Sequence, residues 1–199
     1  MEKRDQEKHR ERQQRLKAKV DAKVAAASEE RGVLLVLTGN GKGKSTAGFG
    51  TVLRAVGHGK RCAVAQFIKG QWECGERNIL TELGVPFYVM DTGFTWDTQD
   101  RAADTAAAEA VWAQIRRALA DPAVDLVLLD ELTYMLSYHY LDVEAVCDAI
   151  AARPPHQHVV ITGRACHRRL LEMADTVSEI TPVKHAFEAG IKAQAGLDW

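Results

Sequence analysis

A glycine-rich stretch, TGNGKGKSTAGFG at residues 38–50, follows directly on the apolar run GVLLVL and constrains this chain more than any other feature. A glycine-rich turn between a strand and a helix leaves successive backbone N–H groups pointing at one anion, and the helix N-terminus adds a favourable field. We therefore predict a phosphate-binding loop followed by a helix. The helix should end at Gly57 and Gly59, since glycines commonly terminate helices.

The spacing of this loop is unusual. The common pattern is GxxxxGK followed by Ser or Thr, but the position five before Gly43 is Thr38, and the first glycine is Gly39. Lys44 is expected to neutralise phosphate charge, and the hydroxyl of Ser45 to ligate a magnesium ion. The predicted nucleotide-binding residues of the loop are Gly39, Asn40, Gly41, Lys42, Gly43, Lys44, Ser45 and Thr46.

Short apolar runs alternate with amphipathic stretches from Arg31 onward. Near-continuous apolar strands that alternate with helices indicate a parallel sheet covered on both faces. The runs expected to be strands are VLLVLT (33–38), CAVAQFI (62–68), PFYVM (86–90), VDLVLLD (124–130) and HVVITG (158–163). We predict an α/β, three-layer P-loop NTPase-like (RecA-like) fold with a mostly parallel central sheet, formed by a single domain at residues 31–199.

Residues 1–30 are expected to form a separate helical arm. Leu16, Val20 and Val24 are spaced by four, which gives a helix with a thin apolar stripe. One interpretation is a frayed, solvated arm. The other is a helix that docks on the body or on a second subunit and orders when a ligand binds.

The overall composition excludes several classes of protein. A net charge of −1 gives no reason to expect nucleic acid binding. The four cysteines lie far apart without a CxxC pair, which favours neither a zinc site nor a disulfide framework and fits a reducing cytosol. No apolar stretch approaches about 18 residues, and the first residues lack the apolar centre of a secretion signal. We expect a cytoplasmic protein with no membrane association.

A second motif, VDLVLLDE at residues 124–131, resembles a Walker B strand. Asp130 and Glu131 stand at the end of a buried strand, where side chains of a parallel sheet face the ligand crevice, and both are predicted to bind the metal ion. Glu131 has an alternative role as a charge in the first turn of a helix. The absence of NKxD argues against guanine recognition, and Gly39 replaces the lysine of dimerising partition ATPases.

Further motifs extend along the chain: AVGHGK, VAQFIKG, GFTWDTQD, LLDELTYML, ITGRACHR and PVKHAFEAGIKAQAGLDW. Together with LTGNGKGKSTAGFG they closely resemble the P-loop family of corrinoid adenosyltransferases over essentially the whole chain. One departure is visible: Ser45 stands where family members commonly have threonine, and the metal-binding hydroxyl is retained.

The resemblance implies transfer of the 5′-deoxyadenosyl group of ATP to cobalt(I) of a corrinoid, with release of triphosphate, in adenosylcobalamin biosynthesis or salvage. Cobalt(I) is itself the nucleophile, so no general base is required. Magnesium, for which manganese can substitute, would stabilise the leaving triphosphate together with Lys42 and Lys44. Arg164 is a further expected contact, although it could equally cap a helix or pair with a surface carboxylate.

The resemblance also gives Phe94 and Trp96 a role on the lower face of the corrinoid, where apolar bulk displaces the axial base and eases reduction of cobalt(II). Two aromatics two positions apart would otherwise indicate a strand face or the edge of a core. Their polar surroundings favour a binding loop. Lys44, Phe94 and Trp96 are the predicted catalytic residues.

The family also implies a homodimer and an electron donor such as a reduced flavoprotein. The alternatives are a P-loop small-molecule kinase and an ATP-gated corrinoid carrier. Among the histidines, His156 and His158 are expected to be solvent-facing loop residues. His167 should lie at a helix start, and His185 has either a functional or a structural hydrogen-bonding role.

Overall fold

The computed structural model describes residues 2–68, 73–90 and 100–199, and the chain divides into two compact units, Met1–Arg31 and Gly32–Trp199. The first unit contains the helix α1 (Glu2–Ala26), in which Lys17 pairs with Asp21 one turn later at 2.5 Å. The predicted helix is therefore present. The three apolar residues of its stripe, Leu16, Val20 and Val24, are exposed, and their docking on any surface stays a prediction.

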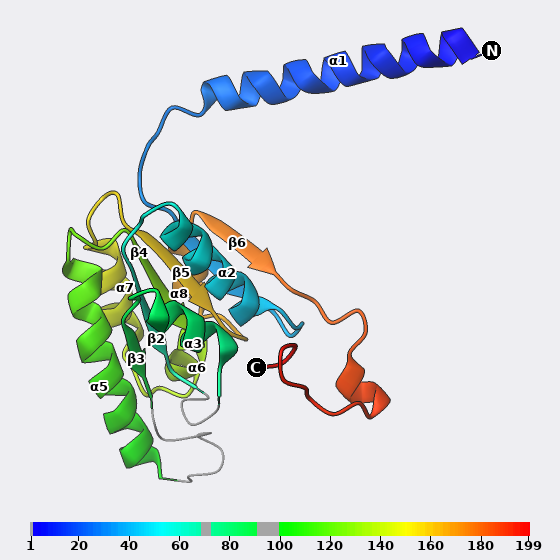
Figure 1. The fold of residues 1–199 in the computed structure, drawn as a ribbon. Coiled ribbons are helices and arrows are strands. Elements are labelled where there is room, and N and C mark those ends of the chain that lie inside the picture. The colour runs from blue at the N-terminus through cyan, green and yellow to red at the C-terminus, as the bar shows by residue number, and fades with distance from the viewer. Residues whose placement is uncertain (1, 69–72, 91–99) are drawn as a thin grey trace. The chain divides into compact units, whose positions relative to one another are not determined.

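The second unit is built on a six-stranded sheet in the order β3-β2-β4-β5-β1-β6, and every pair of neighbours is parallel (Figure 1). The strands are β1 (Leu34–Thr38), β2 (Cys62–Gln66), β3 (Phe87–Val89), β4 (Leu126–Asp130), β5 (His158–Thr162) and β6 (Thr176–Glu179). Because all strands run in the same direction, their carboxyl ends meet at one edge of the sheet, where ligands of such folds bind.

Helices follow most of the strands and cover both faces of the sheet. The helices that the described residues of this unit form are α2 (Lys44–Gly57), α3 (Gly75–Glu82), α5 (Arg101–Ala120), α6 (Leu132–Ser137), α7 (Val143–Ala151), α8 (Arg168–Met173) and the 3-10 turn η1 (Ala186–Ala189). The helix after the glycine-rich loop ends at Gly57 as predicted, and Gly59 just beyond has a positive φ of 72°.

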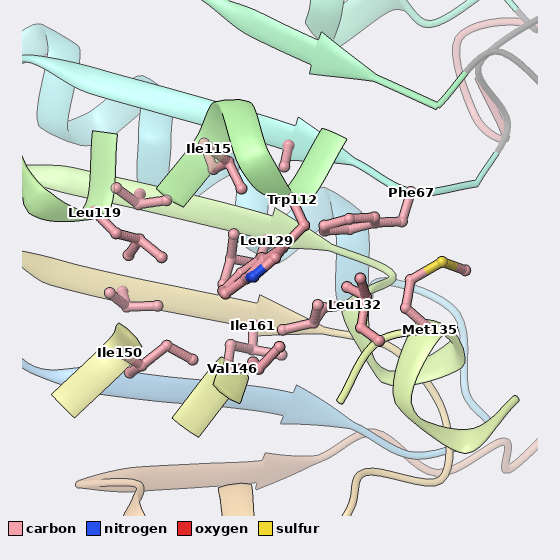
Figure 2. Packing of buried hydrophobic residues seen from close by; sticks show 14 of the residues in the cluster. Phe67, Trp112, Ile115, Leu119, Leu129, Leu132, Met135, Val146, Ile150 and Ile161 are labelled. Carbon is pink, nitrogen blue, oxygen red and sulfur yellow. The ribbon is translucent and has the colours of Figure 1, made fainter. Parts of the chain in front are cut away.

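Two buried clusters, one on each face, follow from the alternation of side chains along the strands. In β4, Val127 and Leu129 join the cluster under α5, α6, α7 and α8, whereas Leu126 and Leu128 join the cluster under α2 and α3. Figure 2 shows the larger cluster, in which Trp112 and Ile150 lie over the sheet. The three-layer P-loop NTPase-like fold is thereby confirmed.

Two local expectations differ from the structure. The edge strand β6, with the sequence TVSE, was not predicted; all four of its residues are exposed, so it lacks the apolar pattern of the other strands. His158 is the first residue of β5 rather than a loop residue, and its Nδ1 accepts a hydrogen bond from the backbone N–H of Val33 at 3.1 Å. Within the described ranges, no helix has the length and apolar character needed to cross a bilayer.

Candidate nucleotide site

The glycine-rich stretch at residues 39–46 comprises the loop 39–43, which connects β1 to α2 at the carboxyl edge of the sheet, and the first three residues of α2. Gly39 has a φ of +98°, and a Cβ at this position would lie 2.5 Å from the carbonyl oxygen of Ile180. Gly43, with a φ of +117°, immediately precedes the first helical residue, Lys44. Such left-handed conformations are accessible to glycine without strain, so the glycines are needed for the shape of this loop.

The segment that follows β6 fastens the loop from outside. The N–H of Gly41 donates to the carbonyl oxygen of Ile180 at 2.7 Å, and the N–H of Ile180 donates to the carbonyl oxygen of Thr38 at 2.8 Å. Two backbone hydrogen bonds therefore hold the end of β1 and the first half of the loop against Ile180, a residue about 140 positions away in sequence. Residues on both sides of this contact, from Asn40 to Thr46, line the cavity described below.

The two lysines of the loop have different surroundings. Lys44 is buried, and its ammonium donates a hydrogen bond to the carbonyl oxygen of Gly41 at 2.7 Å. Lys42 is exposed and forms an ion pair with Asp198 at 2.5 Å. The hydrogen bond from Lys42, followed by one from the N–H of Gln194, lowers the pKa of the Asp198 carboxyl. Both positive charges are thus directed toward acceptors within the protein.

The carboxylates of the Walker B motif are positioned by the neighbouring strand. Asp130, the last residue of β4, is buried and accepts a hydrogen bond from Oγ1 of Thr162 at 2.7 Å. The same hydroxyl accepts the N–H of Glu131 at 3.0 Å. Glu131 has a φ of +58°, a left-handed conformation that non-glycine residues rarely adopt and that often occurs at functional sites. Glu131 is the N-cap residue of α6 and lies just before the first turn, which has no acidic residue, so the alternative role as a first-turn charge is not what the structure shows.

A cavity of about 660 Å³ joins these elements. Its walls include most of the predicted binding residues: Asn40, Gly41, Lys42, Gly43, Lys44, Ser45, Thr46, Asp130, Glu131 and Arg164. Gly39 is not on the wall; its lack of a side chain instead allows the close approach of Ile180. Phe94 and Trp96 lie outside the described residues, so the structure places neither of them.

Arg164 and His185 both reach this cavity. Arg164 is exposed and follows β5 directly after Gly163, so the carboxyl end of the strand presents it to the cavity. His185 is half-buried, and its Nδ1 accepts the N–H of Phe187 at 3.2 Å at the start of η1. His185 therefore has a structural hydrogen bond and a position on the cavity wall. His167 is the N-cap of α8, as predicted.

Several further residues on the wall were not predicted. Gln66 ends β2 directly beside Asp130 in the strand register and accepts a hydrogen bond from Arg77 at 3.1 Å. Tyr134 and Tyr138 stack one helical turn apart with centroids 5.7 Å apart, and burial, followed by the Glu131 carboxylate, raises the pKa of Tyr134. Position at the carboxyl end of a strand was a usable signal for Gln66.

The donor set suits a hard cation. Ser45, Asp130 and Glu131 supply a hydroxyl and two carboxylates to one cavity, and magnesium prefers such oxygen ligands. The described part of the chain contains no group of three or more His, Cys, Asp or Glu residues arranged to hold a metal ion. A magnesium ion on a nucleotide does not require one, because phosphate oxygens and water complete its shell.

The fold and the composition of the cavity define a protein of the P-loop NTPase-like class. A family model described as "ATP:corrinoid adenosyltransferase BtuR/CobO/CobP" matches residues 30–199. The chain belongs to this family of enzymes.

Three bacterial relatives match along almost their entire lengths. The chain is 63% identical over 193 residues to the corrinoid adenosyltransferase CobA of Salmonella typhimurium, covering 97% of this chain and 98% of the relative. It is 62% identical to the corrinoid adenosyltransferase of Escherichia coli with the same coverage. The corrinoid adenosyltransferase of Pseudomonas aeruginosa is 53% identical over 195 residues, covering 97% and 96% of the two chains.

Proposed function

We propose that this protein transfers the 5′-deoxyadenosyl group of ATP to cobalt(I) of a corrinoid and releases triphosphate. The observation that carries the proposal is the cavity of about 660 Å³, in which the glycine-rich loop, the Walker B carboxylates and Arg164 meet. A chain that belongs to the corrinoid adenosyltransferase family and has this cavity is equipped to bind a polyphosphate beside a second substrate.

The chemistry requires binding and charge stabilisation rather than proton transfer. The electron pair of cobalt(I) attacks C5′ of ATP, the C5′–O bond breaks, and the bonding electrons leave with the triphosphate. Cobalt is formally oxidised by two electrons in forming the cobalt–carbon bond, and no proton is gained or lost in this step. The protein therefore contributes by orienting the two substrates and stabilising the leaving group.

The loop and its cations are the proposed binding site for the triphosphate. Helix α2 begins at Lys44 beside the cavity, and the backbone N–H groups at a helix N-terminus point toward an anion that binds there. Lys44 and Lys42 add positive charge on this side, and Arg164 adds it from β5. These side chains would stabilise negative charge as the triphosphate departs.

A magnesium ion is the proposed cofactor, with manganese as a substitute. Ser45, Asp130 and Glu131 would hold it, the carboxylates directly or through water. When bound, the ion supplies further neutralisation of the triphosphate charge. Thr162 keeps Asp130 in place for this role through its hydrogen bond of 2.7 Å.

The short loop suggests how ATP is oriented. A kinase presents the terminal phosphorus to its acceptor, whereas this reaction must present the carbon next to the α-phosphate. We infer that a loop beginning at Gly39 rather than at residue 38 binds the triphosphate in a different register or direction and leaves C5′ accessible.

Reduction of cobalt(II) on the protein is proposed to depend on Phe94 and Trp96. Their apolar side chains would occupy the lower face of the corrinoid and exclude an axial base, which makes cobalt(II) easier to reduce. A reduced flavoprotein is the proposed electron donor. We also propose a cytoplasmic homodimer in which residues 31–199 form the adenosyltransferase domain and residues 1–30 an arm that closes over the corrinoid.

Product analysis tests the activity. The protein is incubated without oxygen with ATP, magnesium, cobalamin and a strong chemical reductant. We expect triphosphate and an alkylcobalt product in equal amounts, the latter recognised by its light-sensitive spectrum. Formation of ADP would support a small-molecule kinase instead, and unchanged ATP would support an ATP-gated carrier.

A further inference from the structure

A turn near the end of the described chain holds Asp198 over the glycine-rich loop. The N–H of Gln194 donates to Oδ2 of Asp198 at 2.9 Å, and the N–H of Asp198 donates to the carbonyl oxygen of Gln194 at 2.8 Å. Gly196 closes the turn by donating to the carbonyl oxygen of Trp199 at 2.8 Å. With Oδ2 engaged in this turn, Oδ1 is directed to the ammonium of Lys42 at 2.5 Å.

Lys42 and Asp198 both belong to the wall of the cavity. The described residues of this wall include three lysine or arginine side chains, Lys42, Lys44 and Arg164. They also include five carboxylates, namely Glu73, Glu76, Asp130, Glu131 and Asp198. A triphosphate carries several negative charges, and Lys42 is paired with the carboxylate of Asp198. A polyphosphate that enters this site therefore competes with the Asp198 carboxylate for the ammonium of Lys42.

The ion pair between Lys42 and Asp198 is weak enough for a phosphate to replace the carboxylate. The side chains of Lys42 and Asp198 are 41% and 24% exposed, and partly exposed pairs contribute little net stability because water and salt screen them. A phosphate oxygen offers the same ammonium a stronger partner, since it carries more charge and lies beside the N–H groups of the α2 terminus.

We propose that the Asp198 carboxylate pairs with the Lys42 ammonium when no phosphate is bound, and that the triphosphate of the nucleotide displaces this carboxylate. When Asp198 pairs with Lys42 again, it assists release of inorganic triphosphate. This inference rests on the proposed function. Asp198 is a positioning residue in this account, because it acts through Lys42 and touches neither substrate. The alternative is that Lys42, with its three donors, binds Asp198 and the phosphate together. In that case the carboxylate would help to orient the lysine and strengthen binding.

The variant Asp198→Asn distinguishes these two roles. It removes the competing charge, so we expect magnesium triphosphate to bind about two- to five-fold more tightly by calorimetry, the range expected for release of a partly exposed ion pair. We also expect stronger inhibition of turnover by added triphosphate. Glu188→Gln is the matched control, because it removes an equal charge from an exposed position that is not on the cavity wall. The control should leave the affinity unchanged.

A double-variant cycle shows whether the effect passes through Lys42. In a Lys42→Gln background, Asp198→Asn should no longer change the affinity for magnesium triphosphate. An unchanged or weaker affinity in Asp198→Asn alone, or a gain that persists without Lys42, would overturn the inference and leave the proposed function intact. If the unaltered protein binds neither magnesium triphosphate nor magnesium ATP, the proposed function itself is wrong, and this inference falls with it.

Discussion

Thr162 donates a hydrogen bond of 2.7 Å from its Oγ1 to Oδ1 of Asp130, and both residues are almost completely buried. The same oxygen accepts the N–H of Glu131 at 3.0 Å. One hydroxyl on β5 therefore fixes both residues of the Walker B pair at the end of β4. A buried carboxylate is costly unless it is hydrogen-bonded, so this contact links the stability of the fold to the geometry of the site.

Replacing Thr162 with valine should destabilise the protein by about 1–3 kcal/mol, because the shape is kept but buried Asp130 loses a donor. Urea unfolding measures this change. Thr162→Ser retains the hydroxyl and should cost less. If the valine and serine variants unfold at the same urea concentration, the hydrogen bond does not have the proposed structural role.

Gly39→Ala should also destabilise the protein, by about 1–3 kcal/mol, because the new methyl group would approach the carbonyl oxygen of Ile180 in a left-handed conformation. Gly57→Ala is the control: a Cβ there meets nothing within 4 Å and φ is not positive. The control should be neutral or slightly stabilising. Equal thermal unfolding of Gly39→Ala and the unaltered protein would contradict the packing described for the loop.

Much of the fold is readable from the sequence because five of its six strands are nearly continuous apolar runs, as expected for strands buried on both faces. The exception is β6. Thr176, Ser178 and Glu179 are polar and exposed, and the strand is formed by pairing with β1 rather than by burial. Local patterns do not reveal such an edge strand.

The site was predictable where a motif places functional groups in consecutive positions, as in the loop and at Asp130 and Glu131. It was not predictable where the contact depends on tertiary structure. Asp198 meets Lys42 across 156 positions of sequence, and nothing in the residues around Asp198 signals that partner. Tyr134 and Tyr138 were missed because a helical spacing of aromatics more commonly indicates a core.

Lys44→Ala should reduce adenosyl transfer about 100-fold or more, whether cobalt(II) or chemically prepared cobalt(I) is supplied, because it removes a buried positive charge beside the departing triphosphate. Lys60→Ala is a suitable control, since Lys60 pairs with Asp125 and is not on the cavity wall. Initial rates under both conditions provide the measurement. A Lys44→Ala enzyme that retains its rate would remove this lysine from the mechanism.

Phe94→Ala and Trp96→Ala should act differently from Lys44→Ala. If these aromatics exclude an axial base, their loss will reduce activity more when cobalt(II) must be reduced on the protein than when cobalt(I) is supplied. The ratio of the two rates, compared with that of the unaltered protein, measures the effect. Equal losses under both conditions would exclude a role in reduction.

The cysteines should react slowly in the folded protein. Burial raises the pKa of Cys62 and of Cys166 to about 11, and it also raises the pKa of Cys74 and Cys147. A thiol of pKa about 11 is about one part in a thousand thiolate at pH 8, so alkylation should accelerate about tenfold per pH unit from pH 7 to 10.

The same shifts act on folding stability with a defined sign. The folded state favours the neutral thiol, so the stabilising contribution is complete below the unfolded pKa of about 8.5 and declines as pH rises toward 11.

Mass spectrometry after brief alkylation, with urea-unfolded protein as the control, tests the predicted slow reaction of the thiols. Rapid labelling of the folded protein at pH 8 would contradict the raised pKa of these thiols.

The central claim is that the loop holds the triphosphate so that C5′, rather than the terminal phosphorus, faces the cobalt. The most direct measurement is a crystal structure with ATP, magnesium and cobalamin bound, in which the distances from cobalt to C5′ and to the terminal phosphorus are compared. We expect C5′ to be the nearer atom, with an open path to cobalt and the triphosphate in contact with Lys44. A nucleotide whose terminal phosphorus points at the corrinoid, with C5′ turned away from it, would contradict the account.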